Sequence, residues 1–191
     1  RIEVPEKITS LGIGPGIGLH QKTKEAIRKF LDSSPELPMV WDADALNILG
    51  DNPILFNKLP EGTIITPHPG EFDRLFGEQE DHFERYKTAC DQAVKRKINI
   101  VLKGGVTIIC QSNGVSFFNT RGNPGMATGG SGDVLTGILL GLLSQGYSPE
   151  YAALLGVYVH ATAGDLASDD LGYESLLSSD IIEYMGDAFE Q

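Results

Sequence analysis

Short apolar segments alternate along the chain with longer segments in which apolar residues recur about every three to four positions. The first pair, residues 8–13 and residues 21–31, predicts a strand followed by an amphipathic helix. The same alternation continues over most of the chain. It predicts further strands at residues 39–41, 63–66 and 98–102, and further helices at residues 45–49, 69–76, 83–97, 132–145, 149–169 and 178–185.

One pair of strands breaks this alternation. Residues 107–111 and 115–118 are β-type segments joined by Ser112-Asn113-Gly114, which predicts a hairpin. Elsewhere helices separate the strands, so the connections must cross over the sheet. We therefore expect an α/β fold with three α/β/α layers, a mostly parallel central sheet and a ligand site beyond the carboxyl ends of the strands.

Composition and charge exclude several classes of protein. The 191 residues are 41% hydrophobic and contain no internal repeat or low-complexity linker, so we expect one domain over residues 1–191. A net charge of −11 without a local run of Lys and Arg argues against nucleic acid and anionic lipid as partners. No apolar run reaches the roughly 20 residues that span a bilayer.

The two cysteines and the first residue add two expectations. Cys90 and Cys110 have neither C-x-x-C nor metal-ligand spacing, which favours free thiols in a reducing, cytoplasmic compartment. The chain begins at Arg1 and enters a strand-like pattern within a few residues. We therefore expect that the N-terminal part of the natural domain is missing from this sequence.

The strongest candidate for chemistry is the glycine-rich segment at residues 123–133, NPGMATGGSGD, which runs directly into an apolar helical pattern. Without Cβ atoms, glycines such as Gly129, Gly130 and Gly132 let backbone N–H groups converge on an anion. The helix dipole adds about half an elementary positive charge at that end. We expect a phosphate or a developing oxyanion to be stabilised there.

Asp133 stands at the start of this predicted helix, and two roles are open to it. It could be an N-cap that accepts backbone hydrogen bonds. A cap does not need neighbouring glycines, whereas a carboxylate at the edge of an anion site can take a proton from an attacking hydroxyl. We therefore interpret Asp133 as the catalytic base, and Gly137 and Gly141 as positions of close helix packing.

A second glycine segment, Lys103-Gly104-Gly105-Val106-Thr107, leaves one predicted strand and enters the hairpin. Lys103 could pair with a phosphate while the glycine backbone approaches a nucleotide. A solvated lysine in an ordinary turn explains the segment about equally well. Neither glycine segment is a P-loop, because G-x-x-x-x-G-K-[ST] does not occur.

A third glycine segment, residues 12–18 with the sequence GIGPGIG, follows the first strand. Its spacing does not match the dinucleotide fingerprint G-x-G-x-x-G. We interpret the segment around Gly16 as a close-approach loop for a substrate, and a purely structural turn is the alternative.

Histidines and carboxylates after other strands complete the candidates. Prolines on both sides of His68 restrict its backbone, which suits ligand positioning, and Glu71 complements the next helix N-terminus. Asp42 and Asp44 would point the same way in extended backbone, as a hydrated metal or a polar substrate requires; alternatively Asp44 caps a helix. His160 lies in an apolar helix and is expected to be simply packed.

These segments together resemble the ADP-dependent (S)-NAD(P)H-hydrate dehydratase family, which belongs to the ribokinase-like superfamily. The resemblance rests on GPG, DADAL, TPHPGE, KGG and above all NPGMATGGSGDVLTG, in that order along nearly the whole chain. It implies a ribokinase-like fold and repair of the S epimer of hydrated NADH or NADPH. ADP would phosphorylate the ring hydroxyl, which is then expelled, so that the reduced cofactor, AMP and phosphate are released.

The resemblance also assigns roles to residues. Asp133 would be the base and would contact the hydrate together with Gly16, Asp44 and His68. The AMP portion would be held by the remaining set: Lys103, Gly104, Gly105, Val106, Thr107, Gly130 and Gly132. Mg²⁺ is implied by the phosphate chemistry, without an identifiable set of protein ligands.

Members of the family commonly form tetramers, and some are fused to an epimerase that interconverts the two hydrates. We therefore expect a homo-oligomer that cooperates with such an epimerase. The main alternative function is a ribokinase-like kinase that transfers phosphate from ATP to a stable alcohol. A nucleotide-binding module without catalysis is the third.

Overall fold

The strands of the computed structural model form a single sheet. The structure describes residues 2, 7–33 and 36–191, and within them a 6-stranded sheet has the order β1-β2-β3-β4-β5-β6. Its strands are β1 (Leu11–Ile13), β2 (Met39–Trp41), β3 (Ile64–Ile65), β4 (Asn99–Leu102), β5 (Thr107–Cys110) and β6 (Ser116–Asn119). Strands β1 to β4 pair in parallel, whereas β5 pairs antiparallel with both β4 and β6. The mostly parallel sheet and its hairpin edge are confirmed.

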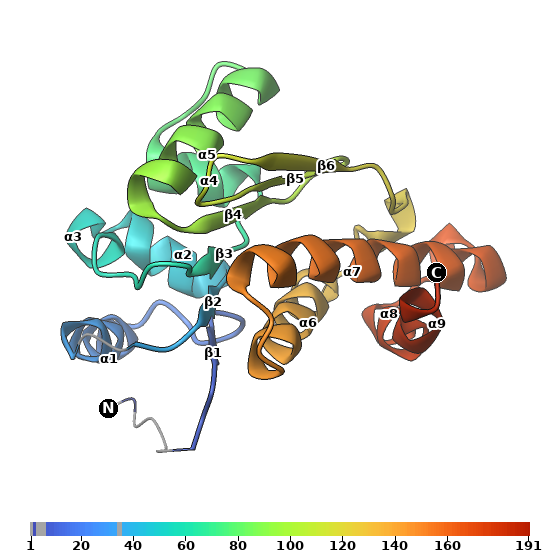
Figure 1. Cartoon of the computed structure of the whole chain (residues 1–191), viewed down its shortest axis with the longest axis horizontal. Coiled ribbons are helices and arrows are strands. Elements are labelled where there is room, and N and C mark those ends of the chain that lie inside the picture. The colour runs from blue at the N-terminus through green and yellow to red at the C-terminus, as the bar shows by residue number, and fades with distance from the viewer. Residues whose placement is uncertain (1, 3–6, 34–35) are drawn as a thin grey trace.

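Helices cover both faces of this sheet, which gives the expected three layers (Figure 1). α6 packs on β1 and β2, α7 packs on β4 and β5, and α5 packs on the same two strands from the opposite face. The helices are α1 (Gln21–Asp32), α2 (Ala43–Gly50), α3 (Pro53–Phe56), α4 (Pro69–Phe76), α5 (His82–Arg96), α6 (Ser131–Ser144), α7 (Pro149–Leu171), α8 (Ser178–Glu183) and α9 (Met185–Phe189), with short 3-10 helices η1 (Pro124–Met126) and η2 (Tyr173–Ser175).

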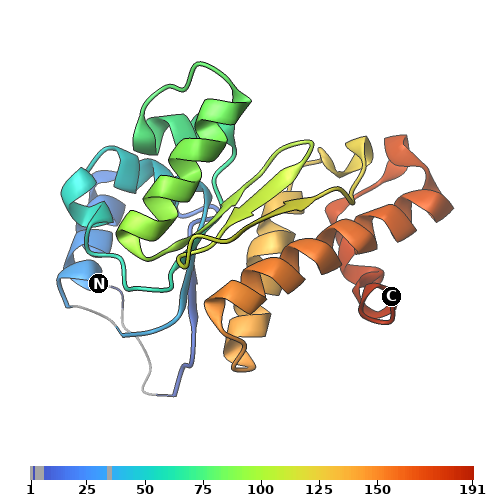
Figure 2. The ribbon, with the colours of Figure 1, turned by 45° about the horizontal axis from the view of Figure 1, so that its top comes forward.

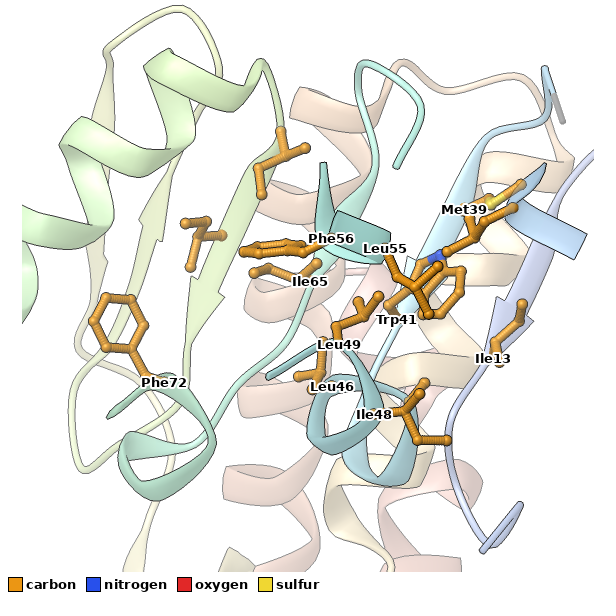
Figure 3. Close-up of a cluster of buried hydrophobic side chains, with 14 of the residues drawn as sticks. Ile13, Met39, Trp41, Leu46, Ile48, Leu49, Leu55, Phe56, Ile65 and Phe72 are labelled. Carbon is orange, nitrogen blue, oxygen red and sulfur yellow. The ribbon is translucent and has the colours of Figure 1, made fainter. Parts of the chain in front are cut away.

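The alternation of side chains along the strands builds one apolar core on each face. In β2, Met39 and Trp41 belong to the core beneath α1 to α5, while Val40 between them faces α6 and α7. Figure 3 shows Met39 and Trp41 among Leu46, Leu49 and other residues of the first core. Because both faces of the central strands are buried, these strands read as continuous apolar runs in the sequence.

Several local predictions were wrong. A Cβ at Gly137 or Gly141 would meet nothing within 4 Å, so neither glycine is required for close packing. Gly156 is required instead, because a Cβ there would lie 2.6 Å from Leu139 of α6. The single helix predicted at residues 178–185 is split, since α8 ends at Glu183 and α9 begins at Met185. The helix α3 was not predicted, since four residues are too few to show a helical period.

Two further expectations can be compared with the fold. Cys90 and Cys110 are free, and their Sγ atoms lie 3.3 Å apart. Among the described residues, no helix combines the length and the apolar character that crossing a membrane requires.

Candidate active site

A cavity of about 870 Å³ opens beyond the carboxyl end of β4. This volume falls within the range of roughly 300–1,000 Å³ that is typical of ligand pockets. The start of the 103–107 segment, the loop between β6 and α6, the first turn of α6 and one side of α7 form its wall. The lining residues include six of the predicted site residues: His68, Lys103, Gly104, Gly105, Thr107 and Gly132.

Lys103 is fixed in this cavity by a buried carboxylate. Its Nζ lies 2.8 Å from Oδ1 of Asp42, whose side chain is only 2% exposed, and 4.0 Å from Oε2 of Glu71. Thr136 of α6 donates a hydrogen bond to the other oxygen of Asp42 at 3.0 Å. A buried carboxylate needs such partners, so Asp42 positions Lys103 rather than leaving it as a solvated lysine. The Lys103 side chain remains 22% exposed toward the cavity.

Free backbone donors lie beside Lys103. Gly130 is the N-cap of α6 with φ of 90°, a left-handed conformation that favours glycine. Among the described residues, no backbone acceptor pairs with the N–H groups of Gly132 and Asp133. A Cβ on Gly132 would lie 3.4 Å from Nζ of Lys103, so only a glycine leaves this space open. These helix N–H groups therefore lie near an ammonium group, an arrangement that can hold an anion.

Asp133 follows Gly132 in the first turn of α6, and its side chain is exposed. The N-cap interpretation of Asp133 is wrong, because Gly130 is the N-cap and α6 has no side-chain cap. Within the described part of the chain, the Asp133 side chain forms no hydrogen bond or ion pair. A carboxylate without protein partners can accept a proton from a bound hydroxyl, so the assignment of Asp133 as the base stays a prediction that the geometry allows.

His68 is held rigidly, as its flanking prolines predicted. It is the N-cap of α4, and its Nδ1 accepts hydrogen bonds from the N–H groups of Gly70 at 3.1 Å and Glu71 at 3.4 Å. In return, Oε2 of Glu71 accepts a hydrogen bond from the His68 N–H at 2.9 Å. This capping box confirms the role predicted for Glu71. It also fixes the His68 tautomer with the proton on Nε2.

The expected common direction of Asp42 and Asp44 is wrong. The chain is extended at Asp42 but enters α2 at Ala43, whose φ is 49°, so the two side chains separate. Asp44 accepts a hydrogen bond from the N–H of Gly18 at 2.8 Å and thereby holds the first glycine loop. Asp42 therefore belongs to the Lys103 cluster, whereas Asp44 stabilises the loop.

The first glycine loop lies close to this cluster but does not line the cavity. A Cβ on Gly14 would lie 1.9 Å from the carbonyl oxygen of Asp42, so this position needs a glycine for structural reasons. Gly16 has φ of 68° and is exposed. Four predicted site residues besides Asp44 are absent from the cavity lining: Gly16, Val106, Gly130 and Asp133. Their contacts with a ligand stay predictions.

His160 of α7 is packed, as expected, but it also lines the cavity. Its Nε2 lies 2.9 Å from the carbonyl oxygen of Ser131, which can only accept, so Nε2 carries the proton. Burial lowers the pKa of His160 to about 4, the hydrogen bond to Ser131 opposes this shift, and the charge of Lys103 adds to it. His160 is therefore neutral near pH 7 and holds the start of α6.

The loop between β6 and α6 supplies one lining residue outside the segments that the sequence singled out. Arg121 belongs to this wall together with Asn123 and Thr128 of the predicted glycine-rich segment. The guanidinium of Arg121 lies 5.2 Å from the ring centroid of Tyr158, a cation–π contact at the cavity. Arg121 is a lone cation with no neighbouring Lys or Arg, so no charge cluster in the sequence indicated it.

The chain that carries this anion site, the buried Lys103 pair and the Asp133 carboxylate is similar to known proteins of one family. A family model described as NAD(P)H-hydrate dehydratase matches residues 2–186. The chain belongs to the NAD(P)H-hydrate dehydratase family. It is 32% identical to the ADP-dependent (S)-NAD(P)H-hydrate dehydratase of Bacillus subtilis, over 98% of this chain and 67% of that protein. It is also 39% identical to the bifunctional NAD(P)H-hydrate repair enzyme Nnr of Moorella thermoacetica, over 94% of this chain and 34% of the relative.

Solved structures of NAD(P)H-hydrate dehydratases agree with the fold. The ADP/ATP-dependent NAD(P)H-hydrate dehydratase of B. subtilis, co-crystallised with ATP/Mg²⁺, superposes with a TM-score of 0.84 at 30% identity, over 98% of this chain and 66% of that one. The ribokinase of Thermotoga maritima superposes with a TM-score of 0.62 at 19% identity, over 95% of this chain and 56% of that one, so it shares the fold. The ribokinase-like fold is confirmed. The chain spans about a third of the length of the bifunctional relatives.

Proposed function

We propose that this NAD(P)H-hydrate dehydratase family member dehydrates the S epimer of hydrated NADH or NADPH at the expense of ADP. The observation that carries the proposal is the anion site formed by Gly132 and Lys103, with the exposed carboxylate of Asp133 next along α6. The B. subtilis relative of the same family is named for this reaction. The cavity beside the anion site is large enough for a nucleotide.

The geometry supports the following chemistry. Asp133 takes the proton of the ring hydroxyl while the hydroxyl oxygen bonds to the terminal phosphorus of ADP and the bond to AMP breaks. Lys103 and the free N–H groups at the start of α6 stabilise the charge on the transferred phosphoryl oxygens. The phosphate then leaves the ring, and loss of a proton from the neighbouring carbon restores the reduced cofactor. Phosphate leaves far more readily than hydroxide, which is why a nucleotide is consumed.

The substrates would occupy different sides of the anion site. We assign the AMP portion of ADP to the wall that contains Lys103, Gly104, Gly105 and Thr107, with Val106 and Gly130 beside it. The hydrated nicotinamide nucleotide would lie toward His68 and the Gly16 loop, which Asp44 supports.

The buried carboxylates at the site fit a magnesium ion. Mg²⁺ binds through one or two carboxylates, phosphate oxygens and water. Asp42 and Glu71 are the buried carboxylates that flank Lys103, and they would hold the ion there. Bound Mg²⁺ would neutralise phosphate charge, and the B. subtilis structure was obtained with ATP/Mg²⁺.

A ribokinase-like kinase is the competing function, because the fold and the anion site would serve it equally well. It would use ATP and leave a phosphorylated alcohol. We also propose cooperation with an epimerase that supplies the S epimer, in line with the bifunctional repair enzymes among the relatives, and a homo-oligomeric assembly.

The reaction can be followed through the absorbance of the reduced nicotinamide. The purified chain, Mg²⁺ and the S epimer of NADH hydrate are mixed with ADP or ATP, and inorganic phosphate is measured in parallel. We expect an absorbance rise that Asp133→Asn lowers by about 10²–10⁴-fold, while Asp187→Asn, another exposed first-turn aspartate, has no effect. A phosphorylated alcohol without an absorbance rise would establish the kinase instead.

A further inference from the structure

Asp165, in the second half of α7, contacts the loop between β6 and α6 that forms part of the cavity wall. Its Oδ2 accepts a hydrogen bond from the N–H of Gly122 at 2.9 Å, and its Oδ1 accepts one from Nδ2 of Asn123 at 3.0 Å. The same Nδ2 donates to the carbonyl oxygen of Gly164 at 2.9 Å. Figure 2 shows the segment between β6 and α6 running from the hairpin to the second half of α7. Asp165 is therefore a bridge between α7 and this loop.

The side chain of Asn123 passes this anchoring on to the loop. While its Nδ2 donates to α7, its Oδ1 accepts a hydrogen bond from the N–H of Gly125 at 3.0 Å. Asn123 is thus the N-cap of η1, and its own carbonyl oxygen accepts from Met126 at 3.1 Å. These partners fix which end of the amide is oxygen and which is nitrogen. The hydrogen bonds to Asp165 and Gly125 therefore define the first turn of the loop.

Close packing on α7 holds the same turn. A Cβ on Gly164 would lie 2.4 Å from Sδ of Met126, so the Met126 side chain of the loop packs directly on the backbone of α7. At its other end the loop runs into Ser131, whose carbonyl oxygen binds His160 of α7 at 2.9 Å. One helix therefore fixes both ends of the glycine-rich segment, with Asp165 at the entrance and His160 at the exit.

We propose that Asp165 is a positioning residue for nucleotide binding, an inference that rests on the proposed function. Arg121, Asn123 and Thr128 line the cavity that Lys103 and the start of α6 also line. Without the Asp165 carboxylate, the N–H of Gly122 and the amide of Asn123 lose an ionised acceptor, whose hydrogen bonds are stronger than neutral ones. The loop would then sample conformations in which the nucleotide wall is not formed.

The first experiment compares Asp165→Asn with the wild type by calorimetric titration with ADP and Mg²⁺, without the hydrate. The substituted amide places an NH2 group against either Gly122 or Asn123, both of which donate. We expect ADP affinity to fall about tenfold. The matched control Asp169→Asn, an exposed position on the same helix, should bind ADP like the wild type.

A kinetic comparison separates positioning from a general structural role. We expect Asp165→Asn to raise the KM for ADP about tenfold and to change the KM for the hydrate less than about twofold. A lower melting temperature with unchanged ADP affinity and KM would overturn the proposal.

The exchanged pair Asn123→Asp with Asp165→Asn provides a rescue. Asn123→Asp alone brings two carboxylates together, whereas the double variant again pairs one carboxylate with one amide but leaves the carbonyl oxygen of Gly164 without its donor. We expect the double variant to bind ADP more tightly than either single variant, while it stays weaker than the wild type. Additive losses would contradict the proposal. If the wild type binds ADP but does not dehydrate the hydrate, only the proposed reaction fails; if it binds no ADP, both proposals fail.

Discussion

A buried polar network lies at each end of β4, and the two networks differ in how many of their hydrogen-bonding groups have a partner within the protein. At the amino end, the side chain of Asn99 accepts from the N–H of Ser112 and donates to the carbonyl oxygen of Gly62. The hydroxyl of Ser112 donates to Glu150 at the start of α7, and Gln111 donates to the carbonyl oxygen of the same residue. Every group in this network has a partner within the protein.

At the carboxyl end, Lys103 is likewise paired with a buried carboxylate, Asp42, but the surrounding donors are not used up. The N–H groups at the start of α6 point to no acceptor in the described part of the chain, and Gly132 keeps the space in front of them open. A satisfied network stabilises a fold, whereas a network with spare donors around a cavity is ready for a ligand. The difference between the two ends predicts how substitutions at each will behave.

The largest effect is expected from Lys103→Met, which removes the cation at the carboxyl end of β4. ADP-dependent activity should fall at least about 100-fold, and the free energy of unfolding should fall by about 2 kcal/mol, because Asp42 is left buried without its cation. Denaturant unfolding and initial rates measure the two losses. Adding Asp42→Asn should restore most of the stability and none of the activity. Recovery of activity in the double variant would show that Lys103 only neutralises Asp42.

The next largest effect is expected on acidification, which should lower the free energy of unfolding through His160. The folded pKa of about 4 lies below the ordinary value of 6.5, so the unfolded chain binds a proton that the folded chain does not. The stabilising contribution is complete above pH 6.5 and is lost as the pH falls toward 4. We expect the wild type to lose about 2 kcal/mol from this group between about pH 7 and pH 5.

The substitution His160→Gln keeps a side-chain NH donor for Ser131 but does not titrate. Its free energy of unfolding, measured by urea denaturation across this pH range, should fall by correspondingly less than that of the wild type. Parallel curves for the two proteins would contradict a depressed pKa of His160.

A methyl group at Gly132 should weaken ligand binding without changing stability. The added Cβ of Gly132→Ala would lie 3.4 Å from Nζ of Lys103 and 3.8 Å from Oδ2 of Asp42, in ordinary contact, yet inside the space where an anion would sit. ADP affinity should fall about tenfold while the melting temperature stays the same. Gly137→Ala in the same helix has free space around it and should gain about 0.5–1 kcal/mol with full activity. Equal affinities in both variants would remove Gly132 from the anion site.

The smallest effect is expected at the amino end of β4, in the network that includes Glu150. Burial raises the pKa of Glu150, but hydrogen bonds from its own backbone N–H, Ser112, Ser148 and Asn99 outweigh burial and lower it. The stabilisation is therefore present above the ordinary pKa of 4.5 and is lost as the pH falls through the lowered value. Glu150→Gln should cost about 1 kcal/mol at neutral pH, lose less stability in acid than the wild type, and keep full activity. A loss of activity would mean that the two ends are coupled.

Periodicity in the sequence predicted the layers of this fold and the glycine-rich entrance to α6, since these depend on neighbours along the chain. The rigid setting of His68 was also predictable, because its prolines and Glu71 are local. The pairing of Lys103 with Asp42 was not, because the partners are 61 residues apart and meet only when β2 and β4 join one sheet.

The residues of α7 that support the site could not be predicted from the sequence, for a different reason. Asp165 and His160 lie in a long helix rich in small residues, in which nothing local indicates that they hold a loop some 30 to 40 positions away. The expected common direction of Asp42 and Asp44 failed on a single backbone angle, the φ of 49° at Ala43 that turns the chain into α2. Patterns of residue type do not predict such an angle.

The two separate apolar cores have a consequence for how long the chain survives among proteases. Lys103 and His68 follow strands of the sheet, whereas Gly132 and His160 belong to the α6 and α7 layer, so the cavity exists only while that layer is docked. A nucleotide that touches both sides opposes every opening that separates them, by about 2.7 kcal/mol when its concentration is 100 times its Kd. Cleavage of transiently opened molecules would slow about 100-fold under those conditions, so the supply of nucleotide would also set the lifetime of the protein.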